Sequence, residues 1–278
     1  MHAVSQVKTA SDMFRLDGRV AFVSAARGHL GQAMARSLAS AGAHVILNGR
    51  DDAKLEQFEK ELRAENFSVS RATFDVTDIQ ALRAFLGGLK RLDVLVNNAV
   101  SMQVKGFSAL APADFALTYE SAVTVAFEAV RAALPALKQA VTAAKDASVI
   151  NVSSMYAMAA PDARMYETRD GQSPFHYGPA KAALLQLTRH LAAELGPQGI
   201  RVNAMAPGPL PSSELASKLP SPVITISARA MRASRSSHAE TKSIPGIRRV
   251  GVAQPRPNGM PPAAPLPGNC MKDASLPK

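Results

Sequence analysis

Two side chains beyond the middle of the chain stand at a spacing that suits proton transfer. Tyr177 and Lys181 are four residues apart, so on a helix they share one face. A Lys ammonium beside a phenol favours the phenolate and lowers the pKa of the Tyr from about 10 toward neutral pH. Such a Tyr serves as a general acid or base toward an alcohol or a carbonyl group. The same spacing occurs on ordinary amphipathic helices, so the surroundings must decide.

A pair of hydroxyl groups precedes these residues. Ser153 and Ser154 follow the apolar run Ser148–Val152, which is predicted to be a buried strand. A Ser hydroxyl at the end of that strand would hold the oxygen atom of a substrate. The joint pattern is more specific than either part alone, and it predicts catalysis by Tyr177 and Lys181 together with Ser153 or Ser154.

The first apolar run of the chain leads into a turn of small residues and then into a helix. Small side chains let backbone N–H groups approach a pyrophosphate, and the helix N-terminus adds a partial positive charge. The turn therefore predicts a dinucleotide site, although a tight strand-to-helix turn without a ligand would look the same. The residues expected to contact the cofactor here are Ser24, Arg27, Gly28, Leu30 and Gly31.

The residues after the second apolar run bear on the choice of cofactor. A dinucleotide domain for NAD usually places an acidic residue there to bond the ribose hydroxyls, whereas this chain has Asn48, Gly49 and Arg50. Arg50, together with Arg27, would pair with a 2′-phosphate, so we expect NADP as the cofactor, with NAD as the alternative. The two acidic residues that follow Arg50 weaken this charge argument.

Two further expectations concern what else the chain binds. Asp75 and Val76 end the third apolar run, where they would meet the adenine; a plain strand end with an Asp cap is an equal alternative. The histidines and the single cysteine, Cys270, show no metal-ligand spacing, so neither a metal site nor a disulfide framework is expected.

These residues need a scaffold that brings strand ends together. Short apolar runs without clean alternation, the pattern of strands buried on both faces, alternate with longer helical stretches. This alternation predicts an α/β fold: a doubly wound, Rossmann-like parallel sheet of about six strands with helices on both sides. The predicted strands are Val20–Ser24, His44–Asn48, Val69–Phe74, Leu92–Val96, Ser148–Val152 and Ile200–Met205. The predicted helices are Leu30–Ala41, Asp51–Ala64, Asp78–Gly88, Pro112–Ala144, which is long enough to be broken, and Tyr177–Leu195.

The chain changes character after residue 215. Residues 216–278 carry 10 Lys and Arg against 2 acidic residues, and they are rich in Pro and Ser. Such a segment cannot bury enough apolar surface to offset its ordering entropy, so we expect a mostly disordered tail, with the composition of a shifted reading frame. The predicted organisation is a flexible N-terminus (1–14), a dinucleotide-binding catalytic domain (15–215) and this basic tail (216–278).

The composition argues against several classes of protein. No apolar run approaches the ~18 residues of a membrane span, and the first residues lack the apolar core of a secretory signal. We therefore expect a soluble, cytoplasmic protein that does not contact membranes. The basic tail lacks the interleaved aromatic residues that stack on bases, so nucleic-acid binding is not expected.

Taken in order, the motifs between residues 15 and 215 resemble those of the short-chain dehydrogenase/reductase superfamily. Within that superfamily the resemblance is to gluconate 5-dehydrogenases and acyl-carrier-protein ketoreductases. The matching residues are the turn from Ser24 to Gly31, Asn97, Asn98 and Ala99 after the fourth strand, Ser153 and Ser154, Tyr177 and Lys181, and Pro207 and Gly208 after the sixth strand.

The resemblance implies a role for each matching residue. Tyr177 would be the catalytic acid or base, and Lys181 would lower its pKa and bond the nicotinamide ribose. Ser154, rather than Ser153, would orient the substrate oxygen. Asn98 and Ala99 would line the adenine-side ribose. Pro207 and Gly208 would flank the nicotinamide.

Several positions depart from the family pattern. Ala25 and His29 stand where the family has glycines, and the Cβ of His29 would hinder a close approach to phosphate. Ala122 stands at the place of the family's proton-relay Asn. The 23-residue gap between the catalytic Ser and Tyr is longer than usual, and its insert, residues 161–173, is expected to form a polar loop over the site mouth. The family's helical lid and seventh strand are not recognisable after residue 215.

Two functions remain open on this basis. The first is an NADP-preferring oxidoreductase that interconverts a secondary alcohol and a ketone by hydride transfer. The second is a catalytically impaired or inactive family member, suggested by the altered glycine turn, Ala122 and the missing lid. The expected partners are a small alcohol or ketone and a second copy of the chain, since the resembled family forms dimers through helices that correspond to Pro112–Ala144 and Tyr177–Leu195.

Overall fold

The computed structural model describes residues 14–166, 168 and 171–208. Its six strands form one parallel sheet in the order β3-β2-β1-β4-β5-β6, the doubly wound arrangement expected from the sequence. Because the strand order reverses between β1 and β4, the loops after these strands open a crevice at their carboxyl ends. The strands are β1 (Val20–Val23), β2 (His44–Gly49), β3 (Val69–Thr73), β4 (Val94–Asn97), β5 (Ala147–Val152) and β6 (Ile200–Met205).

The helices follow the strands in alternation, as predicted. Two of them start at capping side chains: Asp51 accepts the N–H of Lys54, and Asp78 accepts the N–H groups of Gln80 and Ala81. The helices are α1 (His29–Ser40), α2 (Asp52–Ala64), α3 (Ile79–Gly87), α4 (Pro112–Tyr119), α5 (Val125–Ala144) and α6 (Tyr177–Leu195).

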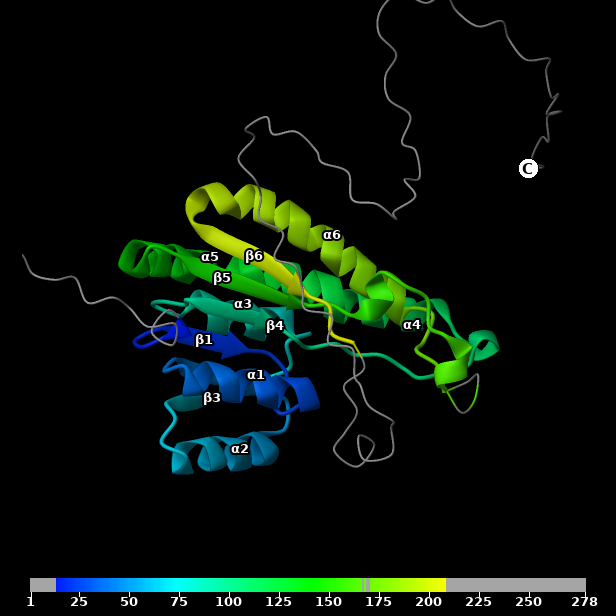
Figure 1. Cartoon of the computed structure of the whole chain (residues 1–278), viewed down its shortest axis with the longest axis horizontal. Helices are drawn as coiled ribbons and strands as arrows, with labels where there is room; N and C mark the ends of the chain where they lie inside the picture. Colours follow the sequence, from blue (N-terminus) through cyan, green and yellow to red (C-terminus); the bar gives the residue numbers. More distant parts are fainter. Residues whose placement is uncertain (1–13, 167, 169–170, 209–278) are drawn as a thin grey trace, which may run out of the picture. The chain divides into compact units, whose positions relative to one another are not determined.

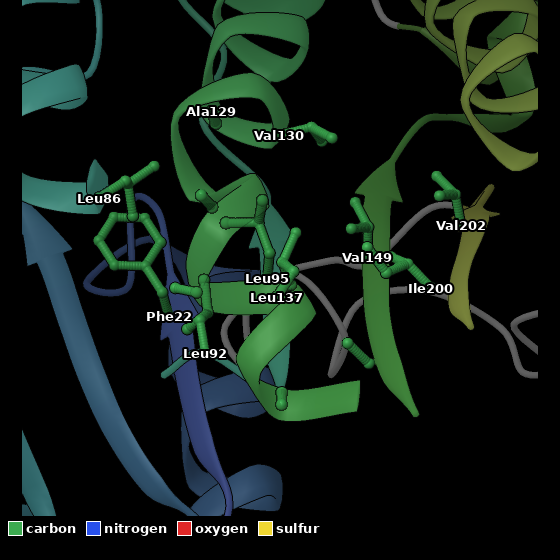
Figure 2. Close-up of a cluster of buried hydrophobic side chains, with 14 of the residues drawn as sticks. Phe22, Leu86, Leu92, Leu95, Ala129, Val130, Leu137, Val149, Ile200 and Val202 are labelled. Carbon is green, nitrogen blue, oxygen red and sulfur yellow. The ribbon is translucent and has the colours of Figure 1, made fainter. Parts of the chain in front are cut away.

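Alternate residues of each strand point to opposite faces of the sheet, and both faces are covered by helices (Figure 1). Ala21 and Val23 of β1 pack with α1 and α2, whereas Phe22 between them packs with α3, α5 and α6. Figure 2 shows this second cluster, in which Leu137 of α5 lies among residues of the sheet. Burial on both faces explains why the strands read as continuous apolar runs.

The long helix predicted for Pro112–Ala144 is interrupted. A π-helical turn, Glu120–Thr124, separates α4 from α5. Within it, the Ser121 hydroxyl accepts the N–H of Ser101 at 2.9 Å, which ties the loop after β4 to the turn. Such turns are frequent at functional sites, and this one carries the buried Ala122.

Several predicted segments lie outside the described residues. They are the N-terminus apart from Phe14, residues 209–215 of the predicted catalytic domain, and the whole of the predicted disordered tail, 216–278. Among the helices of the described part, none is both long and apolar enough to cross a membrane.

Candidate active site

The turn between β1 and α1 is held by the end of β4. The side-chain amide of Asn98 donates to the carbonyls of Ser24 (3.0 Å) and Ala25 (3.2 Å). The Ser24 hydroxyl in turn accepts the backbone N–H groups of Asn98 (2.9 Å) and Ala99 (3.0 Å). These bonds fix the turn at the carboxyl ends of the strands, where a doubly wound fold binds its ligand.

Asn48 braces the same edge from β2. Its side chain is 1% exposed, and the amide donates to the carbonyls of Ala72 (3.0 Å) and Phe74 (3.1 Å). Its backbone carbonyl accepts the N–H of Ala26 at 2.8 Å. Both amide protons are therefore used within the protein. The Asn48 side chain acts here as a structural brace.

Two residues of the turn have demanding backbone positions. Ala25, which replaces a family glycine, has a φ of 49°, a left-handed conformation that costs an L-residue about 1–2 kcal/mol. A Cβ on Gly31 would lie 2.2 Å from the Ala25 carbonyl oxygen, so only glycine fits there. The turn is therefore tight although Ala25 replaces a family glycine, and the backbone strain falls on Ala25.

The N-terminus of α1 is suited to an anion. Gly28 is the N-cap and makes no side-chain cap, and the first helical turn contains no acidic residue. The free N–H groups and the helix dipole together favour negative charge. His29 is exposed at the first helical position, and Leu30 packs against the core that α1 shares with the sheet.

The two arginines expected near a 2′-phosphate differ in their surroundings. The guanidinium of Arg27 lies over the Phe58 ring, 5.8 Å from its centroid, and its Nε is buried without a hydrogen-bond partner. A buried N–H without an acceptor is costly, and its presence indicates a place for an acceptor. Arg50 is 73% exposed on its side chain, with Nη1 3.4 Å from Asp75 Oδ2. Both guanidinium groups suit an anionic ligand.

Asp75 and Val76, expected at the adenine, have different environments. Burial opposes ionisation of Asp75, but hydrogen bonds from Thr77 and the nearby Arg50 more than offset it and lower the pKa of the carboxyl. Val76 is buried in the core. Of the pair, Asp75 has the more accessible side chain.

The predicted catalytic residues meet beside the end of β5. Ser154, Tyr177, Pro207 and Gly208 all line one cleft of about 370 Å³. Tyr177 is the first residue of α6, and the Ser154 hydroxyl lies close enough to its phenol to lower the pKa of Tyr177. The fold therefore brings these four residues together in one cleft, although they come from separate parts of the sequence.

Lys181 lies buried behind this cleft. Its side chain is 2% exposed, and Nζ donates to the Val152 carbonyl at 2.7 Å while lying 5.7 Å from the centre of the Tyr177 ring. Burial lowers the pKa of Lys181 to about 8. The buried Ser153 hydroxyl donates to the Lys181 carbonyl at 2.9 Å, so Ser153 anchors α6 and leaves Ser154 to face the cleft.

The protonation of Tyr177 differs from the sequence-based expectation. Burial raises the pKa of Tyr177 above its usual value, and the nearby Ser154 hydroxyl offsets this only in part. The Lys181 ammonium does not reverse the effect, because burial disfavours its own charge. The phenol is therefore protonated at neutral pH, which is the form that donates a proton.

Ala122, at the place of the family's relay Asn, is buried in the π-helical turn. It borders a cavity of about 10 Å³ that is also lined by Ser24, Asn97 and Ser121. Its other lining residues are apolar, and its volume is at the lower limit for one water molecule.

Sequence reasoning missed three aromatic residues around the site. Tyr156 and Tyr166 line the cleft, and their phenol groups are hydrogen-bonded to each other. His176 is buried, with ring nitrogens 3.0 Å from Thr118 Oγ1 and 3.0 Å from the Gln103 carbonyl oxygen, and it ties the loop after β4 to the start of α6. The only signal in the sequence is their position between Ser154 and Tyr177.

Comparisons with known proteins agree with this architecture. The family model for short chain dehydrogenases matches residues 19–222. The rhamnolipids biosynthesis 3-oxoacyl-[acyl-carrier-protein] reductase of Pseudomonas aeruginosa is 33% identical over 202 residues, which cover 72% of this chain and 75% of that protein. The chain therefore belongs to the short-chain dehydrogenase/reductase family of oxidoreductases.

Two solved structures are similar in fold and sequence. The Pseudomonas aeruginosa RhlG/NADP active-site complex has a TM-score of 0.64 and 31% identity, covering 73% of this chain and 77% of that one. A gluconate 5-dehydrogenase from Burkholderia cenocepacia, in complex with NADP and tartrate, has a TM-score of 0.63 and 28% identity, covering 76% and 78%.

The buried ammonium of Lys181 makes a prediction about stability and pH. The unfolded chain keeps the Lys proton up to its usual pKa of 10.5, whereas the native protein releases it near pH 8. Raising the pH through this window therefore favours the native state. Relative to Lys181→Met, the free energy of unfolding of the wild type should rise by about 2 kcal/mol between pH 7 and pH 10.

Urea unfolding at a series of pH values measures this difference. Lys138→Met is the matched control, because Lys138 is exposed on α5. Its unfolding free energy should follow the wild type at every pH. Parallel pH profiles for the wild type and Lys181→Met would show that the Lys181 ammonium is not desolvated in the native protein.

Proposed function

We propose that the protein is an NADP-preferring oxidoreductase that interconverts a secondary alcohol and a ketone, with Tyr177 as its acid or base. The supporting observation is the cleft in which the Tyr177 phenol and the Ser154 hydroxyl meet, with the Lys181 ammonium buried behind them. Family membership and the NADP complexes of two similar structures support the cofactor.

The described residues fit the chemical groups of NADP. The uncapped N-terminus of α1 suits the pyrophosphate, and the orphaned Nε of Arg27, with the exposed Arg50, suits the 2′-phosphate. Lys181 has further Nζ protons beyond the one given to Val152, and these suit ribose hydroxyls. Pro207 and Gly208 would flank the nicotinamide. NADPH, when bound, supplies a hydride from C4 of that ring.

The remaining steps belong to this chain's own side chains. Ser154 orients the ketone by donating to its oxygen, so the carbonyl is polarised while its carbon accepts the hydride. The same oxygen takes the proton of Tyr177 and becomes a hydroxyl group. Lys181 lies close enough to stabilise the resulting phenolate, which recovers a proton from solvent. The raised pKa of Tyr177 suits this reductive direction.

A cofactor-binding family member with impaired turnover is the second candidate. The strained Ala25 and the replacement of the relay Asn by Ala122 favour it. Neither change removes a group that reacts, and the cavity beside Ala122 is at the lower limit for one water molecule. Turnover measurements separate the two functions directly.

The substitution Tyr177→Phe tests the proposed acid. We expect NADPH-dependent reduction of a panel of small ketones to fall by about 10²–10⁴-fold, because the proton donor is lost while the ring still packs. NADPH affinity should not change. Tyr119→Phe, on the exposed surface of α4, is the control and should keep wild-type rates. Retained turnover in Tyr177→Phe would assign the proton to another group.

We also propose that the protein is a homodimer that associates through the α4–α5 and α6 helices. Phe115 of α4 and Phe127 of α5 are exposed, although large apolar side chains are costly to leave in water. Light scattering at micromolar concentration should give the mass of two chains, and Phe115→Glu with Phe127→Glu should give one. A wild-type monomer or tetramer would contradict this proposal.

A further inference from the structure

Two tyrosines from different segments of the chain line the cleft. Tyr156 belongs to the short helical turn Met155–Ala157 that follows Ser154. Tyr166 comes from the insert, directly after the short helical turn Ala163–Met165. Both side chains line the cleft that contains Tyr177, and their phenol oxygens are hydrogen-bonded to each other. The insert therefore contributes a wall of the site and is more than a polar loop over its mouth.

Tyr156 is held firmly beside the reacting groups. Its backbone N–H donates to the Ser154 hydroxyl at 3.2 Å. Its carbonyl oxygen packs so closely on the first turn of α6 that a Cβ on Gly178 would lie 2.8 Å from it. A side chain fixed in this way can contact the substrate next to the reacting carbon and discriminate between substrates there.

The two phenols have hydrogen-bonding capacity to spare. Each carries one proton, and their mutual bond uses one of the two. No other hydrogen bond to either phenol oxygen is found within the described residues, so one donor and several lone pairs are left for the cleft. Burial, the bond from Tyr166 and the nearby phenols raise the pKa of Tyr156, so this donor is neutral.

The other described walls of the cleft are also neutral. Met102, Val104 and Met155 provide apolar surface, and Gln172 and Ser173 provide uncharged polar groups. No Lys, Arg, His, Asp or Glu from the described residues lines it. A carboxylate or phosphate moved from water into such surroundings would lose hydration without gaining a counter-ion.

We propose that Tyr156 and Tyr166 together bind a second oxygen group of the substrate, and that the substrate is an uncharged polyol or hydroxy ketone. This inference rests on the proposed function, since it describes the same cleft. A site built to hydrogen-bond a hydroxyl group discriminates strongly against an analogue that lacks it. The pair thus determines specificity, while Ser154 and Tyr177 act on the reacting oxygen.

Two matched pairs of alcohols test the proposal in NADP⁺-dependent oxidation. 2,3-Butanediol and 2-butanol differ by one hydroxyl group, and D-glucitol and D-gluconate differ by a carboxylate. We expect kcat/KM to favour the diol and glucitol by about tenfold or more. Tyr156→Phe and Tyr166→Phe should each lose most of the diol preference, and the control Tyr119→Phe should keep it.

Three results would overturn the inference. They are equal kcat/KM for the diol and 2-butanol, a preference for gluconate over glucitol, and an unchanged diol preference in both cleft variants. Circular dichroism shows whether either variant has unfolded. The comparison of the two pairs of alcohols in the wild-type protein needs no variant.

Failure of the proposed function gives a different result. If no alcohol is oxidised and no ketone is reduced, the proposed oxidoreductase function is wrong. A binding measurement then tests whether the tyrosine pair binds a polyol. Saturation-transfer NMR of D-glucitol should show contact with the wild type and lose it in the Tyr156→Phe/Tyr166→Phe double variant. Contact that persists in the double variant, or its absence from the wild type, would overturn the assignment of the tyrosine pair.

Discussion

The meeting of Ser154 and Tyr177, the proposed catalytic groups, depends on two buried hydrogen bonds between the end of β5 and α6. The Lys181 ammonium donates to the Val152 carbonyl, and the Ser153 hydroxyl donates back to the Lys181 carbonyl. Because Ser154 follows Ser153 directly and Tyr177 lies one helical turn before Lys181, these two bonds set how the hydroxyl and the phenol meet. A buried charge is costly, so packing from both elements must hold it in place.

Side-chain hydrogen bonds to backbone groups also position the part of the sheet that is proposed to bind the cofactor. Ser24, Asn48 and Asn98 join neighbouring strand ends by bonds to backbone groups, and these bonds shape the turn before α1. The Nε of Arg27 is a contrast, since it is buried without an acceptor. The polar residues around the turn thus include Ser24, Asn48 and Asn98, which are hydrogen-bonded within the protein, and Arg27, whose Nε is not.

Much of this architecture could be predicted from the sequence. Strands buried on both faces appear as continuous apolar runs, and Asp51 and Asp78 mark helix starts. The strands and the helices α1, α2, α3 and α6 therefore lie within two residues of their predicted ends, whereas the helix predicted over Pro112–Ala144 is divided into α4 and α5. The π-helical turn could not be predicted, because contacts such as that between Ser121 and the distant Ser101 form only in the folded chain. The raised pKa of Tyr177 depends on burial, which spacing does not show. Contacts across the sheet edge, such as that of Tyr166, require the folded chain.

Titration of the wild-type protein with NADPH shows whether the altered turn between β1 and α1 forms an NADP site. The chain has no Trp, so the emission of the reduced nicotinamide can be followed without protein background. We expect a saturable change with NADPH and an affinity for NADH that is weaker by about tenfold or more. This difference should be lost in Arg27→Ala but not in Arg36→Ala, since Arg36 pairs with Glu65. No saturable change with NADPH, or equal affinity for both nucleotides, would contradict the proposed NADP site.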